Sequence, residues 1–280
     1  MTEVQFQSNR IATFGAALKR WRAHRKFSQL QLALESQVSQ RHVSFLESGR
    51  AMPSREMVIQ LAQALEVPLR ERNSLLQAAG FAPVYRQRTF DDEQMKPIRE
   101  ALAMMLKHHQ PYPAVVLDRD YNLLMENPPF QALLKTIAEP QELWRRCSAP
   151  GVKNLLALTF HPDGARPFIE NIEEIARIMA PRLRREMSAP DVDDALRTLV
   201  VDLMSDFSAE EDTAHDISAS PPPVVPLALN VRGVRLKLFS MISTFGTPHD
   251  ITTDELRVEH FFPANDETEK LLRAGAAPVH

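Results

Sequence analysis

The first eighty residues carry apolar side chains with helical spacing. Phe14, Leu18 and Trp21 recur at positions i, i+4 and i+7. This spacing places them on one face of a helix that we expect over residues 11–25. The other faces of this helix carry the arginines Arg20, Arg22 and Arg25. We therefore expect an amphipathic helix with a basic exterior.

Two short helices follow, and each begins at a serine suited to cap it. Ser28 precedes Gln31 by three positions, which is the spacing of a capping box, where each side chain satisfies a backbone N–H at the helix start. This predicts a second helix over residues 29–36. After a two-residue turn, the hydroxyl of Ser39 is suited to cap a third helix over residues 40–47. The sequence thus predicts two helices joined by a tight turn.

Helix-start signals occur twice more before residue 80. Ser54 and Pro68 each open a further amphipathic segment, so we expect five short helices in a first domain of residues 1–85. The composition then changes to proline, glutamine, arginine and acidic residues. This change predicts a connector over residues 86–110, which ends in a helix over 96–108.

The pattern of the remaining chain, residues 111–280, predicts an α+β domain. Residues 114–117 and 121–125 read as a β-hairpin across a turn of three residues. The same criteria predict helices at 127–137, 152–160, 169–187 and 192–206, an exposed acidic and proline-rich loop within 210–223, strands at 224–231, 234–245 and 256–262, and a terminal helix from 265. We therefore expect a multidomain protein, with an all-α domain followed by an α+β domain.

The charge is distributed unevenly along the chain. Residues 1–88 hold 13 Lys and Arg and 6 Asp and Glu, a net charge of +7. The remainder holds 20 basic and 30 acidic residues, a net charge of -10, so the whole chain sums to -3. A basic module beside an acidic remainder is the distribution expected when only one half meets the phosphate backbone of a nucleic acid.

Composition also limits the class of protein. Apolar residues make up 44% of the 280 residues, which is enough to bury a core in each of two domains. The sequence contains neither a signal pattern nor an apolar run that could span a membrane, so we expect a cytoplasmic protein. The single cysteine, Cys147, is expected to be a buried, unreactive thiol. We expect no metal and no cofactor other than a bound apolar molecule.

The second and third predicted helices have the spacing of a helix-turn-helix, and their polar residues point to DNA. Such a motif places the N-terminal end of its second helix in the major groove. Gln40, Arg41 and Ser44 lie on the exposed side of that helix, where glutamine can pair with adenine and arginine with guanine. The side chains of Gln29, Ser39 and Arg50 are placed for phosphate contacts. An ordinary helical hairpin is the alternative interpretation of the same spacing.

This part of the chain resembles the Xre family of bacterial-type transcription regulators, relatives of phage repressors. The resemblance rests on the segments FSQLQLA at 27–33, VS at 38–39 and FLESGR at 45–50. It covers about residues 11–65 and implies a compact five-helix, phage-repressor-like fold, a recognition helix over 39–47, and a homodimer on two-fold related DNA half-sites. Gln37 departs from the family, which commonly has glycine or another small residue in the turn.

The later part of the chain resembles the ligand-binding domain of MmyB-like regulators, through VVLDRDYNLLMEN at 115–127 and NLL at 154–156. The resemblance implies a PAS-like sheet with helices packed on it, and a small apolar effector such as a fatty acid. A pocket between sheet and helices could recruit Phe130, Leu134, Trp144, Phe160, Phe168 and Met241. Aromatic and methionine side chains at such spacing also simply fill a core, so both interpretations stay open.

Two other classes of function compete with a DNA-binding regulator. An enzyme would have to use His108–His109, His161 with Asp163, or His249–Asp250, but none of these belongs to a recognised catalytic motif. We interpret them as solvated loop histidines and expect no enzyme. A protein-docking module that does not bind specific DNA could use the same helices. Loss of binding on raising the salt concentration would favour DNA, because phosphate contacts release counterions.

Overall fold

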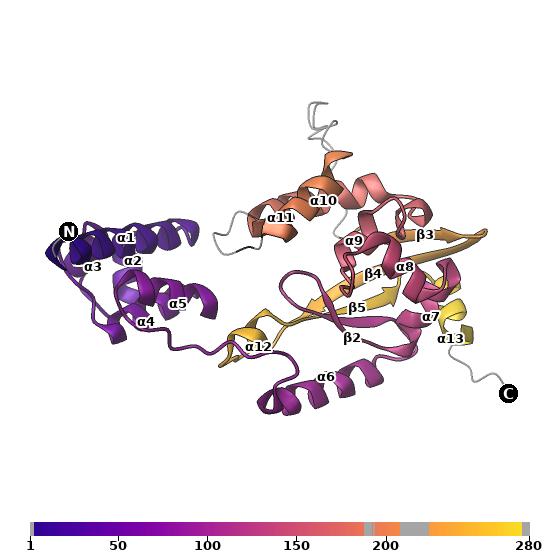
Figure 1. Cartoon of the computed structure of the whole chain (residues 1–280), viewed down its shortest axis with the longest axis horizontal. Coiled ribbons are helices and arrows are strands. Elements are labelled where there is room, and N and C mark those ends of the chain that lie inside the picture. The colour runs from indigo at the N-terminus through magenta and orange to yellow at the C-terminus, as the bar shows by residue number, and fades with distance from the viewer. Residues whose placement is uncertain (1–2, 188–191, 193, 208–223, 276–280) are drawn as a thin grey trace. The chain divides into compact units, whose positions relative to one another are not determined.

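A computed structural model describes residues 3–187, 192, 194–207 and 224–275, with side chains from residue 14 onward. The chain forms two compact units (Figure 1). The N-terminal unit contains residues 1–89 together with residues 245–254, and the C-terminal unit contains residues 90–244 and 255–280. Residues 188–191, between two predicted helices, and the predicted loop within 210–223 lie outside the described residues.

The N-terminal unit contains the five helices that the sequence predicts. They are α1 (Glu3–His24), α2 (Gln29–Glu35), α3 (Gln40–Glu47), α4 (Arg55–Ala64) and α5 (Leu69–Ala78). The hydroxyls of Ser28, Ser39 and Ser54 accept hydrogen bonds from the third backbone N–H after each of them, and Ser28 and Gln31 complete the capping box. Each cap satisfies a backbone donor that would otherwise lack a partner. The starts of α2, α3 and α4 were therefore correctly predicted from local sequence, whereas α1 begins at Glu3, earlier than the predicted residue 11.

Apolar residues from all five helices form one core in this unit. Its most buried large side chains are Phe14, Leu18, Leu32, Leu46, Leu61, Leu65 and Leu76. Gly15 lets α1 approach α3 closely, since a Cβ at this position would lie 2.5 Å from the carbonyl oxygen of Leu46 and 2.7 Å from that of Glu47. Gln37, in the turn between α2 and α3, has φ 53°, a left-handed conformation that glycine adopts at lower cost.

The C-terminal unit contains a five-stranded antiparallel sheet in the order β2-β1-β5-β4-β3. The strands are β1 (Ala114–Leu117), β2 (Leu123–Glu126), β3 (Leu227–Val231), β4 (Val234–Ser243) and β5 (Arg257–Pro263). The predicted hairpins β1–β2 and β3–β4 and the predicted strand β5 are all present. An antiparallel sheet with its helices inserted between β2 and β3 is a PAS-like α+β architecture, as expected.

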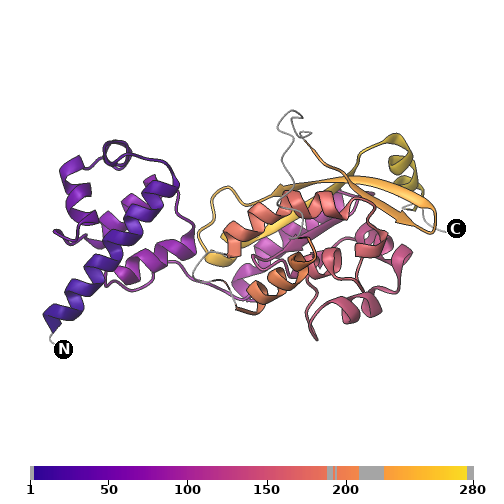
Figure 2. The same cartoon turned by 90° about the horizontal axis from the view of Figure 1, so that it is seen from above.

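Helices pack on both faces of this sheet. They are α6 (Lys96–His108), α7 (Pro128–Ile137), α8 (Pro140–Cys147), α9 (Leu155–Phe160), α10 (Ile172–Met187), α11 (Asp194–Ser205) and α13 (Asp266–Gly275), with short 3-10 turns η1 (Glu93–Met95) and η2 (Arg166–Phe168). Apolar residues of α7 to α11 form one cluster with side chains of the sheet, and α10 and α11 lie side by side over it (Figures 1 and 2). The helix α6 lies on the other side of the sheet (Figure 1).

The sequence did not predict two of the helices, α8 and α12 (Ile251–Glu255). Both are shorter than the windows of 11 to 18 residues over which helical periodicity becomes visible. The strand β3 begins at Leu227, so the predicted start at Val224 was too early. Cys147 is 5% exposed, and burial raises the pKa of its thiol, which confirms the expected buried cysteine.

Candidate DNA-binding surface and ligand-binding core

The first turn of α3 presents polar side chains to solvent. Gln40 and Arg41 are exposed, whereas Val43 and Leu46 on the opposite side of the helix are completely buried. The core therefore fixes which face of α3 points outward. The guanidinium of Arg41 lies over the ring of Phe45, 5.1 Å from its centroid, and this contact restricts the arginine without removing it from the surface.

The other predicted DNA-contacting residues surround this turn. Ser39 is exposed, and its hydroxyl oxygen accepts a hydrogen bond of 3.2 Å from the N–H of His42. Ser44 is half-buried, and Arg50 is exposed just beyond the end of α3. The structure thus brings Ser39, Gln40, Arg41 and Ser44 together on one helix, with Arg50 following it.

The side chain of Gln29 is held by a hydrogen bond to Glu47. Its amide Nε2 donates to the carboxylate of Glu47 over 2.8 Å. Arg22 donates to the same carboxylate twice, from Nε over 2.6 Å and from Nη2 over 3.1 Å. Burial alone would raise the pKa of Glu47, but the hydrogen bonds from Arg22 and Gln29, together with nearby positive charge, outweigh burial and leave this pKa lowered. These three residues, the Arg22–Glu47–Gln29 triad, connect α1, α2 and α3.

The triad corrects one expectation about the surface of α1. Arg22 does not belong to a free basic exterior, because its side chain is 14% exposed and paired with Glu47. Arg25 also makes structural contacts, since its guanidinium donates to the carbonyl oxygens of Leu65 and Glu66 at the end of α4. Of the three predicted exterior arginines, Arg20 and Arg25 are exposed and Arg22 is not. No local pattern could show this, because the partners of Arg22 and Arg25 are distant in sequence.

Five of the six predicted ligand-binding residues lie in one apolar cluster of the C-terminal unit. Phe130, Leu134, Trp144 and Phe160 are buried there, and Phe168 packs against it. Met241 is instead 58% exposed. It pairs in register with His260, whereas the neighbouring Phe261 points to the opposite face and into the cluster. The strand register therefore separates Met241 from the other five.

Polar atoms are also buried in this unit. Within the described residues, three buried side-chain atoms have no hydrogen-bond partner: Glu126 Oε2, Trp144 Nε1 and Arg257 Nη1. The indole N–H of Trp144 is notable because the residue is only 4% exposed and belongs to the apolar cluster. A buried donor without an acceptor costs about 1 to 3 kcal/mol, so an acceptor delivered by a ligand would stabilise this position.

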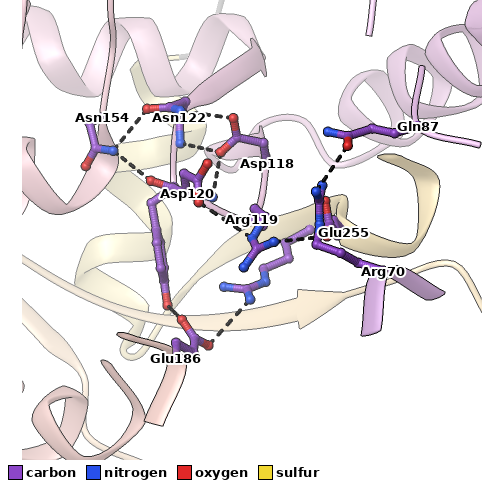
Figure 3. Close-up of polar contacts among 11 residues, drawn as sticks. Arg70, Gln87, Asp118, Arg119, Asp120, Asn122, Asn154, Glu186 and Glu255 are labelled. Carbon is purple, nitrogen blue, oxygen red and sulfur yellow. Dashed lines mark hydrogen bonds and ion pairs between the residues drawn. The ribbon is translucent and has the colours of Figure 1, made fainter. Parts of the chain in front are cut away.

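A charged network lies at the start of β5 (Figure 3). The hydroxyl of Tyr121 donates to Glu186 over 2.7 Å. Glu186 also pairs with Arg182 at 3.0 Å and with Arg257 at 3.4 Å. Burial, and then the bond to Glu186, raises the pKa of Tyr121 to about 12. One carboxylate therefore connects α10, β5 and the turn between β1 and β2.

That turn is built by side-chain amides and a carboxylate (Figure 3). Asp118 accepts hydrogen bonds from the backbone N–H groups of Asp120 and Asn122, at 2.8 and 2.9 Å. The amide of Asn154 donates to the carbonyl oxygen of Asp120 and to the side chain of Asn122. Tyr121 is held at φ 64° within this turn. Four polar residues of the segments that carried the second family resemblance, Asp118, Asp120, Asn122 and Asn154, thus form one hydrogen-bonded network.

Several histidines were the candidates for an enzyme site in the sequence. Among the described residues, no group of three or more His, Cys, Asp or Glu side chains could hold a metal ion. His109 is not the solvated loop residue that we expected. It is half-buried, its ring lies 4.8 Å from that of His260 and 4.9 Å from that of Phe262, and its Nε2 lies 3.0 Å from the carbonyl oxygen of Phe261. It anchors α6 to β5.

Comparison with known protein families gives two matches. Residues 98–274 match the MmyB-like transcription regulator ligand binding domain, and residues 18–72 match a helix-turn-helix family. No curated protein matches the chain significantly. One similar solved structure is titled "Structure of an RNA-binding Light-Oxygen-Voltage Receptor", with 12% identity and a TM-score of 0.27. The match covers 97% of this chain but 64% of that structure.

Hydropathy adds one finding. Within the described helices, none is both long enough and apolar enough to cross a membrane.

Proposed function

The chain belongs to the MmyB-like transcription regulators, and we propose that it binds a specific double-stranded DNA operator through α3, in the cytoplasm, as a homodimer. The observation that carries this proposal is the exposed first turn of α3. Gln40 and Arg41 are directed outward there by the burial of Val43 and Leu46. Because the core fixes the outward face, the same few side chains meet DNA in every complex.

Each residue of this surface has a proposed role. Gln40, Arg41 and Ser44 contact base edges in the major groove, where bidentate glutamine or arginine pairs discriminate by about 1 to 3 kcal/mol. Ser39 and Arg50 contact phosphates, which position the protein without reading sequence. Gln29 joins them, because its amide has two hydrogens and only one is needed by Glu47.

The test is fluorescence anisotropy with DNA from the promoter region of the protein's own gene, at several salt concentrations. We expect Arg41→Ala to lose about 1 to 3 kcal/mol of specific binding and to keep the wild-type salt slope. Arg50→Ala should instead reduce the salt slope by about 1. Arg177→Ala, at an exposed position of α10, removes the same charge and is expected to change neither quantity.

The alternative is a protein-docking module. If wild-type protein binds no DNA fragment tightly even at low salt, the proposed operator binding fails and docking becomes the better account of α3. Binding that weakens steeply with salt supports DNA, because counterion release requires phosphate contacts. The net charge of +7 over residues 1–88 favours the DNA interpretation.

The proposed effector is a small apolar molecule such as a fatty acid, held by the apolar cluster of the C-terminal unit. Phe130, Leu134, Trp144 and Phe160 supply apolar contacts, and the unpaired indole N–H of Trp144 supports a ligand that carries an oxygen. Solvent extraction and mass spectrometry of purified protein test this proposal, together with melting temperatures measured with added fatty acids. No extracted lipid and no change in melting temperature would reject it.

We further propose that the effector changes the spacing of the two recognition helices in a dimer. It can shift DNA affinity only by as much as its own affinity differs between the two arrangements. Sedimentation equilibrium tests the dimer. A fatty-acid titration that leaves operator affinity unchanged would remove this mechanism while leaving DNA binding intact.

A further inference from the structure

The connection between β4 and β5 is longer than the sheet requires. The two strands are antiparallel neighbours in which Ser243 pairs with Val258, and hairpin loops between such strands usually have 2 to 5 residues. Here the connection spans residues 244–256 and includes α12. Residues 245–254 of this connection belong to the compact N-terminal unit, although both flanking strands belong to the C-terminal unit.

One end of α12 caps α5. The carboxylate of Asp254 accepts a hydrogen bond of 2.9 Å from the N–H of Leu69, the first residue of α5. The residue at the cap position, Pro68, makes no side-chain cap bond. Asp254 therefore supplies, from 185 residues away in sequence, the kind of acceptor that α2, α3 and α4 obtain from their own serines. Unlike a serine, it also places a negative charge at the N-terminus of the helix.

The other end of this segment holds residues 86–88. Asp250 is 7% exposed and forms an ion pair with Arg88. The N–H of Ile251 donates to the carbonyl oxygen of Arg86 over 2.9 Å, and the hydroxyl of Thr252 donates to the carbonyl oxygen of Arg88. Residues 86–88 and residues 250–252 are thus joined by backbone and side-chain hydrogen bonds and by one ion pair.

The residues that follow Asp254 are fixed within the C-terminal unit. Glu255 pairs with Arg119 at 3.5 Å, and Arg119 lies in the turn between β1 and β2 (Figure 3). Arg257, two residues further along, pairs with Glu186 and stacks its guanidinium over the ring of Tyr121. The segment that caps α5 therefore continues directly into the charged network at the start of β5.

We propose that residues 245–254 form a clasp that couples the start of β5 to the helix-turn-helix unit, by setting whether the N-terminus of α5 is capped. α5 packs on α1 and α4, and α1 packs on α3. Loosening α5 therefore weakens the support of the recognition helix. The coupling is conformational and does not depend on which effector binds, or on whether one binds.

The direct test is hydrogen–deuterium exchange of the full-length protein, read by mass spectrometry over residues 69–78. We expect Asp254→Ala to increase exchange at the start of α5 by about 2- to 30-fold, as for loss of a helix cap. Asp254→Asn keeps an acceptor and should show a smaller increase, and it serves as the second variant if the alanine protein does not fold. Asp266→Ala, in the exposed first turn of α13, is the matched control. Unchanged exchange in α5 for both Asp254 variants would overturn the clasp.

The coupling is tested from the other side by Glu255→Gln and Arg119→Gln. These changes break the ion pair in the C-terminal unit, and we expect them to increase exchange in residues 69–78 as well. Arg145→Gln breaks the exposed pair with Glu142 and should leave α5 unchanged. If the first two variants alter exchange near β5 but not in α5, the segment is a passive linker and the coupling is rejected. Because this readout uses no DNA, failure of the operator proposal would leave the result interpretable.

Discussion

Arg22 and Glu47 form a two-point ion pair that ties the last turn of α1 to the end of α3, with N–O distances of 2.6 and 3.1 Å. The two side chains are 14% and 5% exposed. A pair this buried resembles an interior contact more than a surface ion pair, and Gln29 adds a third point of attachment. The orientation of α3, the proposed recognition helix, therefore depends on the ion pair between Arg22 and Glu47.

Removing one partner of this pair should destabilise the protein. We expect Glu47→Ala to lower the free energy of unfolding by about 3 kcal/mol, because Arg22 would remain partly buried without its carboxylate. Urea denaturation measures the change. Glu142→Ala, which breaks exposed ion pairs with Arg145 and Arg146, should cost less than about 1 kcal/mol. Equal costs at the two sites would show that the Arg22–Glu47 pair contributes no more than a surface pair.

Glu47 should also make stability depend on pH. Its pKa is lower in the folded chain than in the unfolded chain, where a glutamate has a pKa of about 4.3. Its stabilising contribution is therefore complete above the unfolded pKa and is lost as pH falls through the folded pKa. We expect the difference in unfolding free energy between wild type and Glu47→Gln to shrink below about pH 4. A difference that stays constant from neutral to acidic pH would contradict this expectation.

The close approach at Gly15 predicts a second effect on α3. Gly15→Ala would place a Cβ within 2.7 Å of two carbonyl oxygens in the last turn of α3, so backbone must move. We expect a loss of about 1 to 3 kcal/mol, as for other overpacked sites, and weaker DNA binding. Gly275→Ala meets no atom within 4 Å and is the control. Thermal unfolding compares the two, and unchanged stability of Gly15→Ala would show that the helices can separate freely.

The turn of the helix-turn-helix offers a stabilising substitution. Gln37 has φ 53°, where a residue with a Cβ is strained by about 1 kcal/mol and glycine is not. Gln37→Gly should raise the free energy of unfolding by up to about 1 kcal/mol, although the greater freedom of the unfolded chain offsets part of the gain. Gln37→Ala keeps the Cβ and should bring no gain. Urea denaturation would refute the account if the alanine variant gained as much as the glycine variant.

The indole N–H of Trp144, which has no hydrogen-bond partner, predicts that a substitution here lowers the affinity for a ligand but changes the stability of the free protein little. Trp144→Phe removes a buried donor that has no acceptor, so the free protein should change in stability by less than about 1 kcal/mol. The rise in melting temperature caused by a long-chain fatty acid should fall in the variant, whereas the effect of an alkane of equal length should not. Equal fatty-acid shifts in both proteins would show that the indole does not contact the ligand.

Local sequence pattern was enough to predict the five-helix domain, the hairpins of the sheet and the outward face of α3. The caps at Ser28, Ser39 and Ser54 join residues three positions apart, and the burial of Val43 and Leu46 follows from one helical period. Such interactions depend on local geometry, which spacing along the chain already describes.

The partners of the charged residues depend on how distant segments of the chain meet in the folded protein. Arg22 and Glu47 are 25 residues apart, and Asp254 and Leu69 are 185 apart. Each pair exists because two segments cross at a particular point, and a periodic pattern carries no information about where that occurs. Strand register likewise placed Met241 on the face away from Phe261, a difference of one residue that reverses the direction of a side chain.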